Sequence, residues 1–232
     1  FKFHENSPVT FQDPLPDSVD VAIIGGGVIG ICTAWNLVQR GLRVLVCDKG
    51  RVAGEQSSRN WGWVRSMGRD PDEVPIAMDA TTAWENFQAE LGDGIGFRRE
   101  GITALTKSEK EMAGYQDWIE DVAKKYNLDT RIMASDEANQ LVGAEPGTWL
   151  GGMYTASDGR AEPFTATPTI AKALHSKGCT ILENCAVRVI ETKAGQVSAV
   201  VTEHGRVKAD VVVCAAGAWA SLFLSNLGVR PP

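Results

Sequence analysis

Several features that mark common classes of protein are scarce or missing in this 232-residue sequence. Its three histidines, His4, His175 and His204, lack the close spacing typical of metal ligands. No serine stands in the G-x-S-x-G turn of a serine hydrolase. Acidic residues outnumber basic ones by 29 to 23, and no basic stripe is available to neutralise phosphates. These absences argue against a metal centre, a hydrolase of that type and a nucleic-acid-binding surface.

The sequence also lacks a long apolar run and a recognisable leader. Its longest apolar stretches have the length of strands, so no transmembrane helix is predicted. Residues 1–16 are polar and contain prolines, which does not predict a signal peptide. Because the chain begins with Phe1 and not with Met, we expect it to be trimmed or to begin inside a longer product. With 44% hydrophobic residues, the sequence can nevertheless bury a sizeable core.

Cysteine is present, but no two cysteines form a C-x-x-C pair. The five are Cys32, Cys47, Cys179, Cys185 and Cys214. An odd number without paired spacing predicts free thiols, most of them packed as small apolar groups. Free thiols are typical of a reducing compartment, and we therefore expect a cytoplasmic location.

The most informative pattern in the chain is the glycine-rich segment 20–30, Asp-Val-Ala-Ile-Ile-Gly-Gly-Gly-Val-Ile-Gly. It predicts a buried strand that turns into a helix, with Gly25 in the turn, Gly27 next to a pyrophosphate and Gly30 where the helix packs closely on the strand. A second apolar strand follows and ends in Asp48, whose carboxylate can accept hydrogen bonds from a ribose. This order predicts a dinucleotide-binding site, and the alternative is a glycine-rich turn in another α/β protein.

The far end of the chain indicates which dinucleotide is bound. Residues 206–217 form a further apolar strand that ends in Ala-Ala-Gly, but a long insertion separates it from Asp48. A simple NAD-binding domain alternates strands and helices without such an interruption. The insertion is typical of two-domain flavoproteins, so we expect an α/β fold with a Rossmann-like, glutathione-reductase-type FAD-binding domain and an inserted, incomplete α+β substrate domain.

The sequence resembles the D-amino-acid-oxidase-like (DAO) superfamily of FAD-dependent amine oxidoreductases, which includes glycine oxidases, sarcosine oxidases and D-amino-acid dehydrogenases. Four segments carry the resemblance, in the order usual for that family: Val21–Gly30, Ser57–Arg65, Ser157–Pro163 and Ala209–Trp219. The resemblance implies FAD as the cofactor and oxidation of a carbon–nitrogen bond of an amino acid or secondary amine. In that reaction a hydride passes to flavin N5 and leaves an imine.

The resemblance also implies which residues hold FAD. Those around the pyrophosphate would be Gly25, Gly27, Val28, Ile29 and Gly30. Those flanking the adenosine would be Asp48, Lys49 and the backbone of Val187. The loop beside the pyrophosphate and the isoalloxazine would be Ser57, Ser58, Arg59, Asn60, Trp61 and Gly62. Those along the ribityl chain and the ring would be Ala215, Ala216, Gly217 and Trp219. Two departures from the family are Asp48, where many relatives have Glu, and the bulky pair Trp61 and Trp63, where many have small residues.

The order of these motifs also predicts the domain boundaries. Residues 1–18 are predicted to be an arm or linker, residues 19–73 and 157–232 a discontinuous FAD-binding domain, and residues 74–156 part of a substrate domain. Superfamily members usually continue beyond the Ala-Ala-Gly strand. We therefore expect this chain to be an N-terminal portion, completed by a second chain or derived from a truncated product. The alternative is a compact, short homologue.

Local patterns predict the elements between these motifs. A helix is expected over 74–91, and another after Ser108, with Ser108 and Glu111 as a capping box. Its apolar stripe would contain Met112, Tyr115, Ile119, Val122 and Tyr126. Further helices are expected near 135–143 and over 162–176, and a strand pair over 97–106. Short strands are expected over 179–214, with turns at Ala194-Gly195 and His204-Gly205.

No catalytic acid or base can be assigned, because the family generally works without one. Arg65 is a candidate for binding a substrate carboxylate through its guanidinium fork, and Arg69 is a weaker one. Either arginine could instead pair with a nearby surface acid such as Asp70 or Asp72. Three other functions stay open: an FAD-dependent hydroxy-acid dehydrogenase, a hydroxylase, and a non-catalytic FAD-holding half of a hetero-oligomer.

Overall fold

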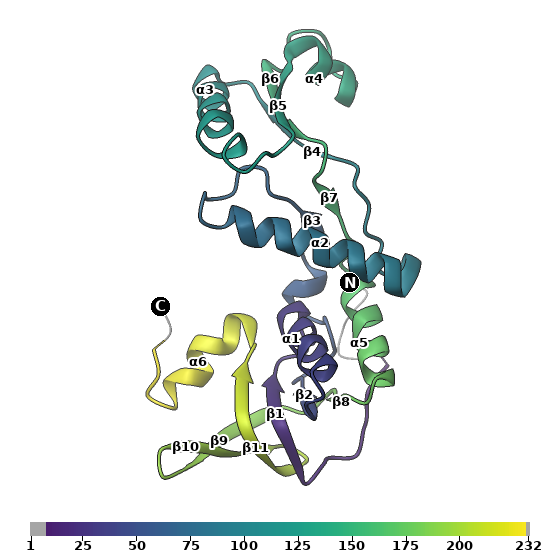
Figure 1. Ribbon diagram of the computed structural model, residues 1–232, viewed down its shortest axis with the longest axis vertical. Coiled ribbons are helices and arrows are strands. Elements are labelled where there is room, and N and C mark those ends of the chain that lie inside the picture. The colour runs from purple at the N-terminus through teal and green to yellow at the C-terminus, as the bar shows by residue number, and fades with distance from the viewer. Residues whose placement is uncertain (1–7, 231–232) are drawn as a thin grey trace. The chain divides into compact units, whose positions relative to one another are not determined.

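A computed structural model describes residues 8–230 (Figure 1). The chain forms two compact units, the first containing residues 8–61 and 163–230 and the second residues 62–162. The unit boundaries therefore fall at Trp61 and Glu162, whereas the sequence predicts domain boundaries at 73 and 157. The assignment of FAD binding and substrate binding to separate domains stays a prediction.

The first unit is built on a six-stranded mixed sheet with the order β8-β2-β1-β11-β10-β9. Strands β8, β2, β1 and β11 run parallel, and β10 pairs antiparallel with both β11 and β9. Their bounds are β1 Ser18–Ile24, β2 Val44–Cys47, β8 Thr180–Leu182, β9 Val187–Lys193, β10 Gln196–Thr202 and β11 Gly205–Cys214. The predicted mixed α/β fold with a parallel sheet is confirmed.

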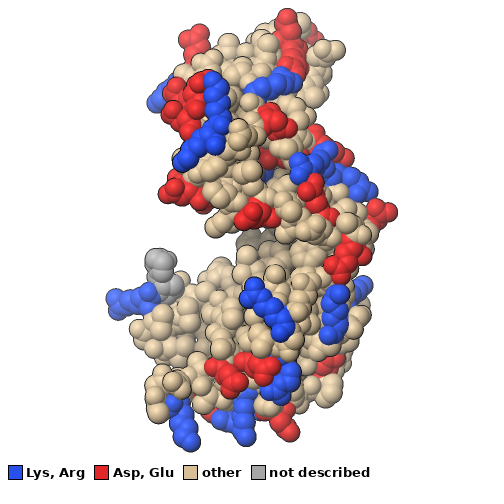
Figure 2. All heavy atoms as spheres, in the orientation of Figure 1, with Lys and Arg blue, Asp and Glu red and all other residues tan. Residues whose placement is uncertain are grey.

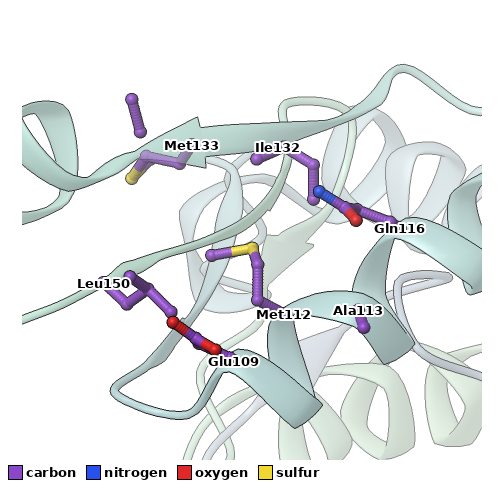
Figure 3. Close-up of a pocket in the computed structure, with 8 residues that line it drawn as sticks. Glu109, Met112, Ala113, Gln116, Ile132, Met133 and Leu150 are labelled. Carbon is purple, nitrogen blue, oxygen red and sulfur yellow. The ribbon is translucent and has the colours of Figure 1, made fainter.

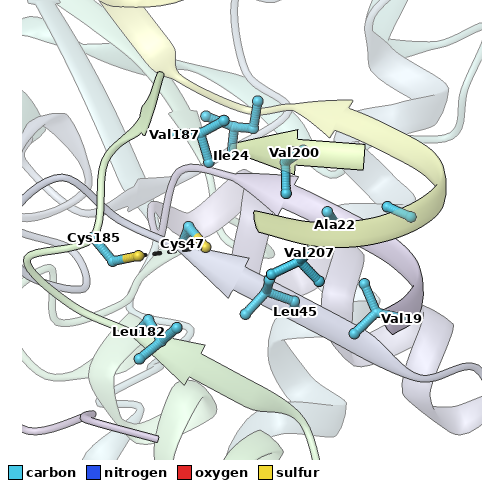
Figure 4. Packing of buried hydrophobic residues seen from close by; sticks show 11 residues of the cluster. Val19, Ala22, Ile24, Leu45, Cys47, Leu182, Cys185, Val187, Val200 and Val207 are labelled. Atoms are coloured by element: carbon cyan, nitrogen blue, oxygen red, sulfur yellow. Dashed lines mark hydrogen bonds between the residues drawn. The ribbon is translucent and has the colours of Figure 1, made fainter. Parts of the chain in front are cut away.

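The central strands β1 and β2 of this sheet are largely buried, whereas β9 and β11 are partly exposed. Every residue of β2 is buried, as expected for a central parallel strand. Helices α1 (Val28–Gln39) and α5 (Ala166–Ser176) contact each other beside the sheet. Figure 4 shows the aliphatic cluster on the strands, including Leu45, Val200 and Val207, each fully buried. A short helix, α6 (Ala220–Ser225), follows β11.

Both turns predicted among the short strands lie where expected. Ala194 and Gly195 both adopt positive φ angles, 53° and 79°, which suits the tight connection between β9 and β10. Gly205, with φ 140°, begins β11 after the second turn. Helix α5 begins at Ala166, later than the predicted start at Glu162.

The described part of the predicted N-terminal arm lies against the first unit. Phe11 is buried, and Gln12 forms an antiparallel bridge with Leu182 at the edge strand β8. The buried Glu183 carboxylate accepts hydrogen bonds from the N–H groups of Thr10 at 2.6 Å and Phe11 at 3.3 Å. Residues 8–13 thereby cover the otherwise open edge of the sheet. The rest of the predicted arm, residues 1–7, lies outside the described residues.

The second unit contains a three-stranded antiparallel sheet, order β4-β6-β5, and a two-stranded ribbon, β3-β7. The strands are β3 Trp63–Val64, β4 Ile102–Thr106, β5 Thr130–Ala134, β6 Gly151–Thr155 and β7 Gly159–Arg160. The helices are α2 Val74–Leu91, α3 Glu109–Trp118 and α4 Ser135–Val142. Helix α2 has the predicted bounds, and α4 ends at Gly143 in the left-handed conformation.

Two predicted features of this unit are only partly present. Ser108 caps α3 through its hydroxyl, which accepts a hydrogen bond from the Glu111 N–H at 3.3 Å. The Glu111 carboxylate completes no capping box, because it bonds to the Thr106 hydroxyl. The predicted apolar stripe is interrupted where α3 passes into a π-helical turn at Ile119–Ala123. Of the predicted strand pair over 97–106, β4 forms, while Arg98 makes a single bridge to Arg160.

A buried carboxylate explains why the boundary falls before residue 73. Asp158, which is 2% exposed, accepts hydrogen bonds from the backbone N–H of Ser66 at 2.8 Å and of Met67 at 3.0 Å. The following residue, Gly159, lies so close to Arg98 that a Cβ there would be 2.2 Å from the Arg98 carbonyl oxygen. The Ser157–Pro163 motif thus ties the segment after Trp61 into the second unit.

The surface carries mixed charge. On the face seen in Figure 2, basic and acidic side chains lie among one another. Exposed ion pairs include Arg43–Asp20 at 2.7 Å and Arg99–Glu85 at 2.6 Å, and solvent screening makes such pairs weak contributors to stability. Within residues 8–230, no helix is both long and apolar enough to cross a membrane.

Candidate cofactor-binding site

A hollow of about 670 Å³ opens in the first unit where the parallel strands end at their carboxyl termini. The carboxyl ends of parallel strands are where open α/β sheets place their ligands, and roughly 300–1,000 Å³ is the usual size of a ligand pocket. Thirteen predicted residues line it: Gly25, Gly27, Val28, Ile29, Asp48, Lys49, Ser57, Asn60, Val187, Ala215, Ala216, Gly217 and Trp219. The hollow therefore gathers residues from four separate stretches of the sequence.

Glycines allow the backbone to close around the start of α1. Gly25 has φ 112°, and a Cβ there would lie 2.4 Å from the carbonyl oxygen of Ala215 at the end of β11. A Cβ on Gly30 would lie 2.0 Å from the Gly25 carbonyl oxygen. Gly30 is buried and outside the lining, so its contribution is the close packing of α1 on the β1 turn.

The N-terminus of α1 faces this hollow without an acidic residue in its first turn. Gly27 occupies the N-cap position and offers no side-chain cap. The Val28 N–H donates to the hydroxyl oxygen of Ser57 at 2.8 Å, which leaves the hydroxyl proton of Ser57 able to donate elsewhere. N–H groups and the positive end of a helix dipole together favour an anion such as a pyrophosphate.

Asp48 is held in place by two backbone groups. Its Oδ2 accepts from the Gly26 N–H and its Oδ1 from the Gly50 N–H, each at 2.7 Å. Burial raises the pKa of the Asp48 carboxyl, while the two N–H donors act in the opposite direction. Each oxygen retains a lone pair, so the carboxylate can still accept a hydroxyl proton.

Charged side chains at the rim of the hollow are paired with one another. The Lys49 ammonium lies 3.3 Å from Glu55 and 3.5 Å from the ring centre of Trp219, a cation–π geometry. Arg188 in β9 and Glu203 in the turn after β10 form a second ion pair. Lys49 and Trp219, which are far apart in the sequence, therefore lie side by side in one wall of the hollow.

Five predicted cofactor residues are placed outside the lining. Gly30 packs α1, as described above. Ser58 is buried and donates to the Glu55 carbonyl oxygen at 3.2 Å, and Arg59 pairs with the Glu55 carboxylate at 2.9 Å. Trp61 is 79% exposed, and Gly62 belongs to the second unit, where its carbonyl accepts from the Ala161 N–H. Their predicted contact with FAD stays a prediction.

The two candidate substrate arginines lie in the second unit. The Arg65 guanidinium donates to the Met67 carbonyl oxygen and lies 5.7 Å from the Trp63 ring centre. Arg69 pairs with Glu73 at 3.4 Å, and not with the expected Asp70 or Asp72. Arg69 therefore forms a surface ion pair, which was the alternative to carboxylate binding, but its partner is Glu73.

Sequence reasoning missed eleven residues of the lining: Ile24, Cys47, Glu55, Gln56, Ala186, Arg188, Glu203, Ala218, Leu222, Phe223 and Asn226. Three of them, Leu222, Phe223 and Asn226, share one side of the chain at α6, an i, i+1, i+4 spacing that signals a helix face. The others lie within two residues of a predicted residue in the sequence, except Glu203, which the turn after β10 brings to Arg188.

A second hollow, of about 300 Å³, lies within the second unit between α3 and the β5-β6 pair. Figure 3 shows Met112 and Met133 facing it from the helix and from β5. Its one acidic lining residue is Glu109, and the remaining lining is apolar apart from Gln116. This shallow, methionine-rich surface offers little to orient a polar substrate.

Comparison with known proteins identifies the family. Residues 20–232 match the DAO family, FAD dependent oxidoreductase, so the chain belongs to that family. It is 25% identical over 231 residues to the mitochondrial sarcosine dehydrogenase of Mus musculus, covering 95% of this chain and 25% of that protein. It is 28% identical to an N-methyl-L-tryptophan oxidase of Yersinia pestis, covering 91% of this chain and 57% of that protein.

A solved structure resembles the fold as well. The L-amino acid deaminase from Proteus myxofaciens, solved in complex with anthranilate, matches with a TM-score of 0.88 and 38% identity. The match covers 96% of this chain and 51% of that one. This chain thus spans about a quarter to a little over half of these relatives, whose names refer to amino acids or N-methylated amino acids.

The residues of the hollow fit the FAD that characterises this family. The anion site at the N-terminus of α1 suits a pyrophosphate, and the Gly25 and Gly27 positions keep the approach free of side chains. The Asp48 carboxylate suits a ribose hydroxyl, and Ala215–Ala218 with Leu222 and Phe223 supply apolar walls. The donor set and the apolar walls of the hollow are therefore compatible with FAD.

Proposed function

We propose that this chain is the FAD-holding part of an oxidoreductase that oxidises the carbon–nitrogen bond of an amino acid or N-methylated amino acid. The observation that supports it most directly is the hollow, in which the uncapped start of α1, Ser57 and Asp48 converge. FAD, when bound, supplies the two-electron acceptor of the reaction. The family match and the names of the relatives support the substrate class.

The chain's own contribution is to hold and orient the cofactor. The N–H group of Ile29 and the Ser57 hydroxyl, which is itself oriented by the Val28 N–H, would bind the pyrophosphate. Asp48 would bind the adenosine ribose, and the backbone next to Val187 would contact the adenine. Ala215, Ala216, Gly217 and Trp219 would line the ribityl chain and the flavin ring. The apolar walls would exclude water from the flavin side of the hollow.

The spectrum of the native protein tests this proposal. A bound flavin band that bleaches anaerobically with an amino acid or a secondary amine is expected. A protein that contains no flavin and takes none up from solution would refute the cofactor assignment. A flavin that bleaches with hydroxy acids but with no amine would favour the hydroxy-acid dehydrogenase instead.

Replacing Ser57 tests the pyrophosphate site itself. Ser57→Ala removes the acceptor of the Val28 N–H and one potential donor to a phosphate oxygen, so we expect the Kd for FAD to rise roughly tenfold. Isothermal titration of the flavin-free protein measures it. The matched control is Ser176→Ala, since Ser176 bonds only locally to the Lys172 carbonyl in α5, and its Kd should be unchanged. Equal affinities of the Ser57 variant and the wild type would contradict the placement.

A test of the proposed carboxylate-binding role of Arg65 requires a protein preparation that oxidises its substrate. Arg65→Met is expected to raise the KM for an amino acid at least about tenfold with a smaller change in kcat, because a bidentate charged contact is lost. Arg69→Met, which removes only an exposed pair with Glu73, serves as control. An unchanged KM in the Arg65 variant would assign that side chain to the local contact with Met67.

The activity belongs to the whole protein, and the relatives contain sequence beyond the part matched here. We propose that the further sequence completes the substrate site, as part of the same protein or as a second chain. Gel filtration with mass analysis of native material distinguishes a self-sufficient chain from an FAD-holding half that needs a partner.

A further inference from the structure

Two cysteines that are far apart in sequence meet under the hollow. The Sγ atoms of Cys47 and Cys185 lie 4.0 Å apart and share a weak hydrogen bond, drawn as the dashed line in Figure 4. Cys185 is 0% and Cys47 2% exposed. Cys47 ends β2, whereas Cys185 lies between β8 and β9. Nothing in cofactor binding or in the proposed oxidation requires two thiols at this place.

The pair differs chemically from the thiols of Cys32 and Cys179. The hydrogen bond with Cys47 lowers the pKa of Cys185, and the Thr202 hydroxyl and His204 act in the same direction. The same hydrogen bond, together with burial, raises the pKa of Cys47. One thiol of the pair therefore loses its proton more readily than an isolated buried thiol, and the thiolate is the reactive form of cysteine. By contrast, burial raises the pKa of Cys32 to about 11.

The hollow gives access to this otherwise buried pair. Cys47 is part of the hollow's lining, and so are Asp48 on one side and Ala186 and Val187 next to Cys185. The two segments are already joined by the Cys185 N–H, which donates to the Asp48 carbonyl oxygen at 2.8 Å. A ligand at the adenosine end of the hollow would therefore stand between the thiols and the solvent.

We propose that Cys47 and Cys185 form a reversible disulfide when the protein is free of FAD, with hydrogen peroxide as the oxidant. The proposal rests on the assignment of the hollow to FAD. The thiolate of the pair attacks one peroxide oxygen, which breaks the O–O bond and gives a sulfenic acid. The second sulfur then displaces the sulfenic oxygen as water and forms the S–S bond. In total, two thiols and one peroxide give one disulfide and two waters.

The disulfide alters the hollow because the sulfurs must approach to about 2.05 Å. Starting from 4.0 Å, this shift pulls on Cys47, whose neighbour Asp48 binds the Gly26 turn, and on Cys185, whose neighbours Ala186 and Val187 line the hollow. The oxidised protein is therefore expected to bind FAD about tenfold more weakly, and a dithiol reductant should restore the binding.

The test is oxidation of the full chain with and without FAD. Purified protein, stripped of flavin or reloaded with it, is treated with hydrogen peroxide, alkylated and mapped by mass spectrometry of its peptides. The expected result is a Cys47–Cys185 cross-linked peptide in the stripped protein. With free FAD at about a hundred times its Kd, the rate should fall about a hundredfold. Absence of the cross-link, equal rates in both forms, or a linkage through Cys32, Cys179 or Cys214 would overturn the proposal.

Variants and a direct binding measurement separate this inference from the cofactor assignment. Cys185→Ser should bind FAD normally and lose the peroxide effect on binding, whereas Cys32→Ser should keep the effect. If peroxide weakens FAD binding in Cys185→Ser as much as in the wild type, the disulfide is not responsible. If the stripped protein cross-links but never binds FAD, the cofactor assignment fails while the dithiol stands. If the stripped protein binds FAD but never cross-links, the disulfide proposal fails while the cofactor assignment stands.

Discussion

The Gly25–Gly30 turn of the first unit and the Ser66–Met67 segment of the second unit are held in place by different means. In the first unit, the loops around the hollow are positioned by glycines whose missing side chains let backbone meet backbone, as at Gly25 and Gly30. In the second unit, a buried carboxylate on Asp158 gathers the N–H groups of Ser66 and Met67. Close packing at a glycine uses no N–H group, whereas the Asp158 carboxylate uses two. The comparison teaches that a missing Cβ can hold a loop without using its N–H groups, whereas a buried carboxylate holds a loop through them.

The largest effect is expected from closing the glycine contact in the first unit. In Gly30→Ala the new Cβ would meet the Gly25 carbonyl oxygen at 2.0 Å, so α1 must move away from the strand. We expect a loss of about 3 kcal/mol in the free energy of unfolding and a loss of FAD binding. Urea unfolding and flavin titration measure both.

The control for this prediction is a helical glycine of the second unit. No heavy atom lies within 4 Å of a Cβ on Gly114 in α3, so Gly114→Ala should stabilise the protein by about 0.5–1 kcal/mol. If the two variants had equal stability, close backbone packing at Gly30 would not contribute to the stability of the first unit.

A smaller and more local effect is expected from the carboxylate clamp. Asp158→Ala leaves the N–H groups of Ser66 and Met67 without their acceptor in a buried place, at a cost of about 2 kcal/mol. Hydrogen exchange should increase in residues 62–67 while FAD binding is kept. Asp129→Ala, which removes an exposed carboxylate bonded to Ser157, is the control and should change little. Loss of FAD binding in the Asp158 variant would show that the two units do not behave separately.

The smallest expected effect is a difference in pH dependence. The pKa of Asp48 is raised in the folded protein by burial, so the folded state binds a proton at higher pH than the unfolded state does. Its contribution to stability is therefore present at low pH and is lost as pH rises through the folded pKa. We expect the unfolding free energy of the wild type, relative to Asp48→Asn, to increase as pH falls from about 7 to about 4.

The pKa of Glu137 in the second unit is shifted in the opposite direction, so its contribution to stability should have the opposite pH dependence. A hydrogen bond from Arg131 lowers the pKa of Glu137, so its contribution is present above the unfolded pKa and is lost as pH falls through the folded one. The advantage of the wild type over Glu137→Gln should therefore shrink on acidification. If the difference in unfolding free energy between wild type and variant changed with pH in the same direction for Asp48→Asn and Glu137→Gln, the opposite pKa shifts of the two carboxyl groups would be contradicted.

Much of the fold was predictable because its signals are local. The strand, turn and helix around Gly25–Gly30 follow from apolar runs and glycine spacing, and α2 has its predicted bounds at Val74–Leu91. The Ser108 cap was predictable for the same reason, since donor and acceptor lie three residues apart. The π-helical turn at Ile119–Ala123 was not, because no pattern in that sequence distinguishes it from a continuing α-helix.

By itself, the sequence determined the glycine-rich turn before α1, the acid that follows β2 and the family, because each depends on residues adjacent in the chain or on a shared order of motifs. Tertiary structure alone decided which side chains complete the hollow. The cation–π contact of Lys49 with Trp219 and the meeting of Cys47 with Cys185 join residues that no spacing rule connects. The physical reason is that strand order in a sheet, set by how all the apolar faces are buried together, determines which distant segments become neighbours.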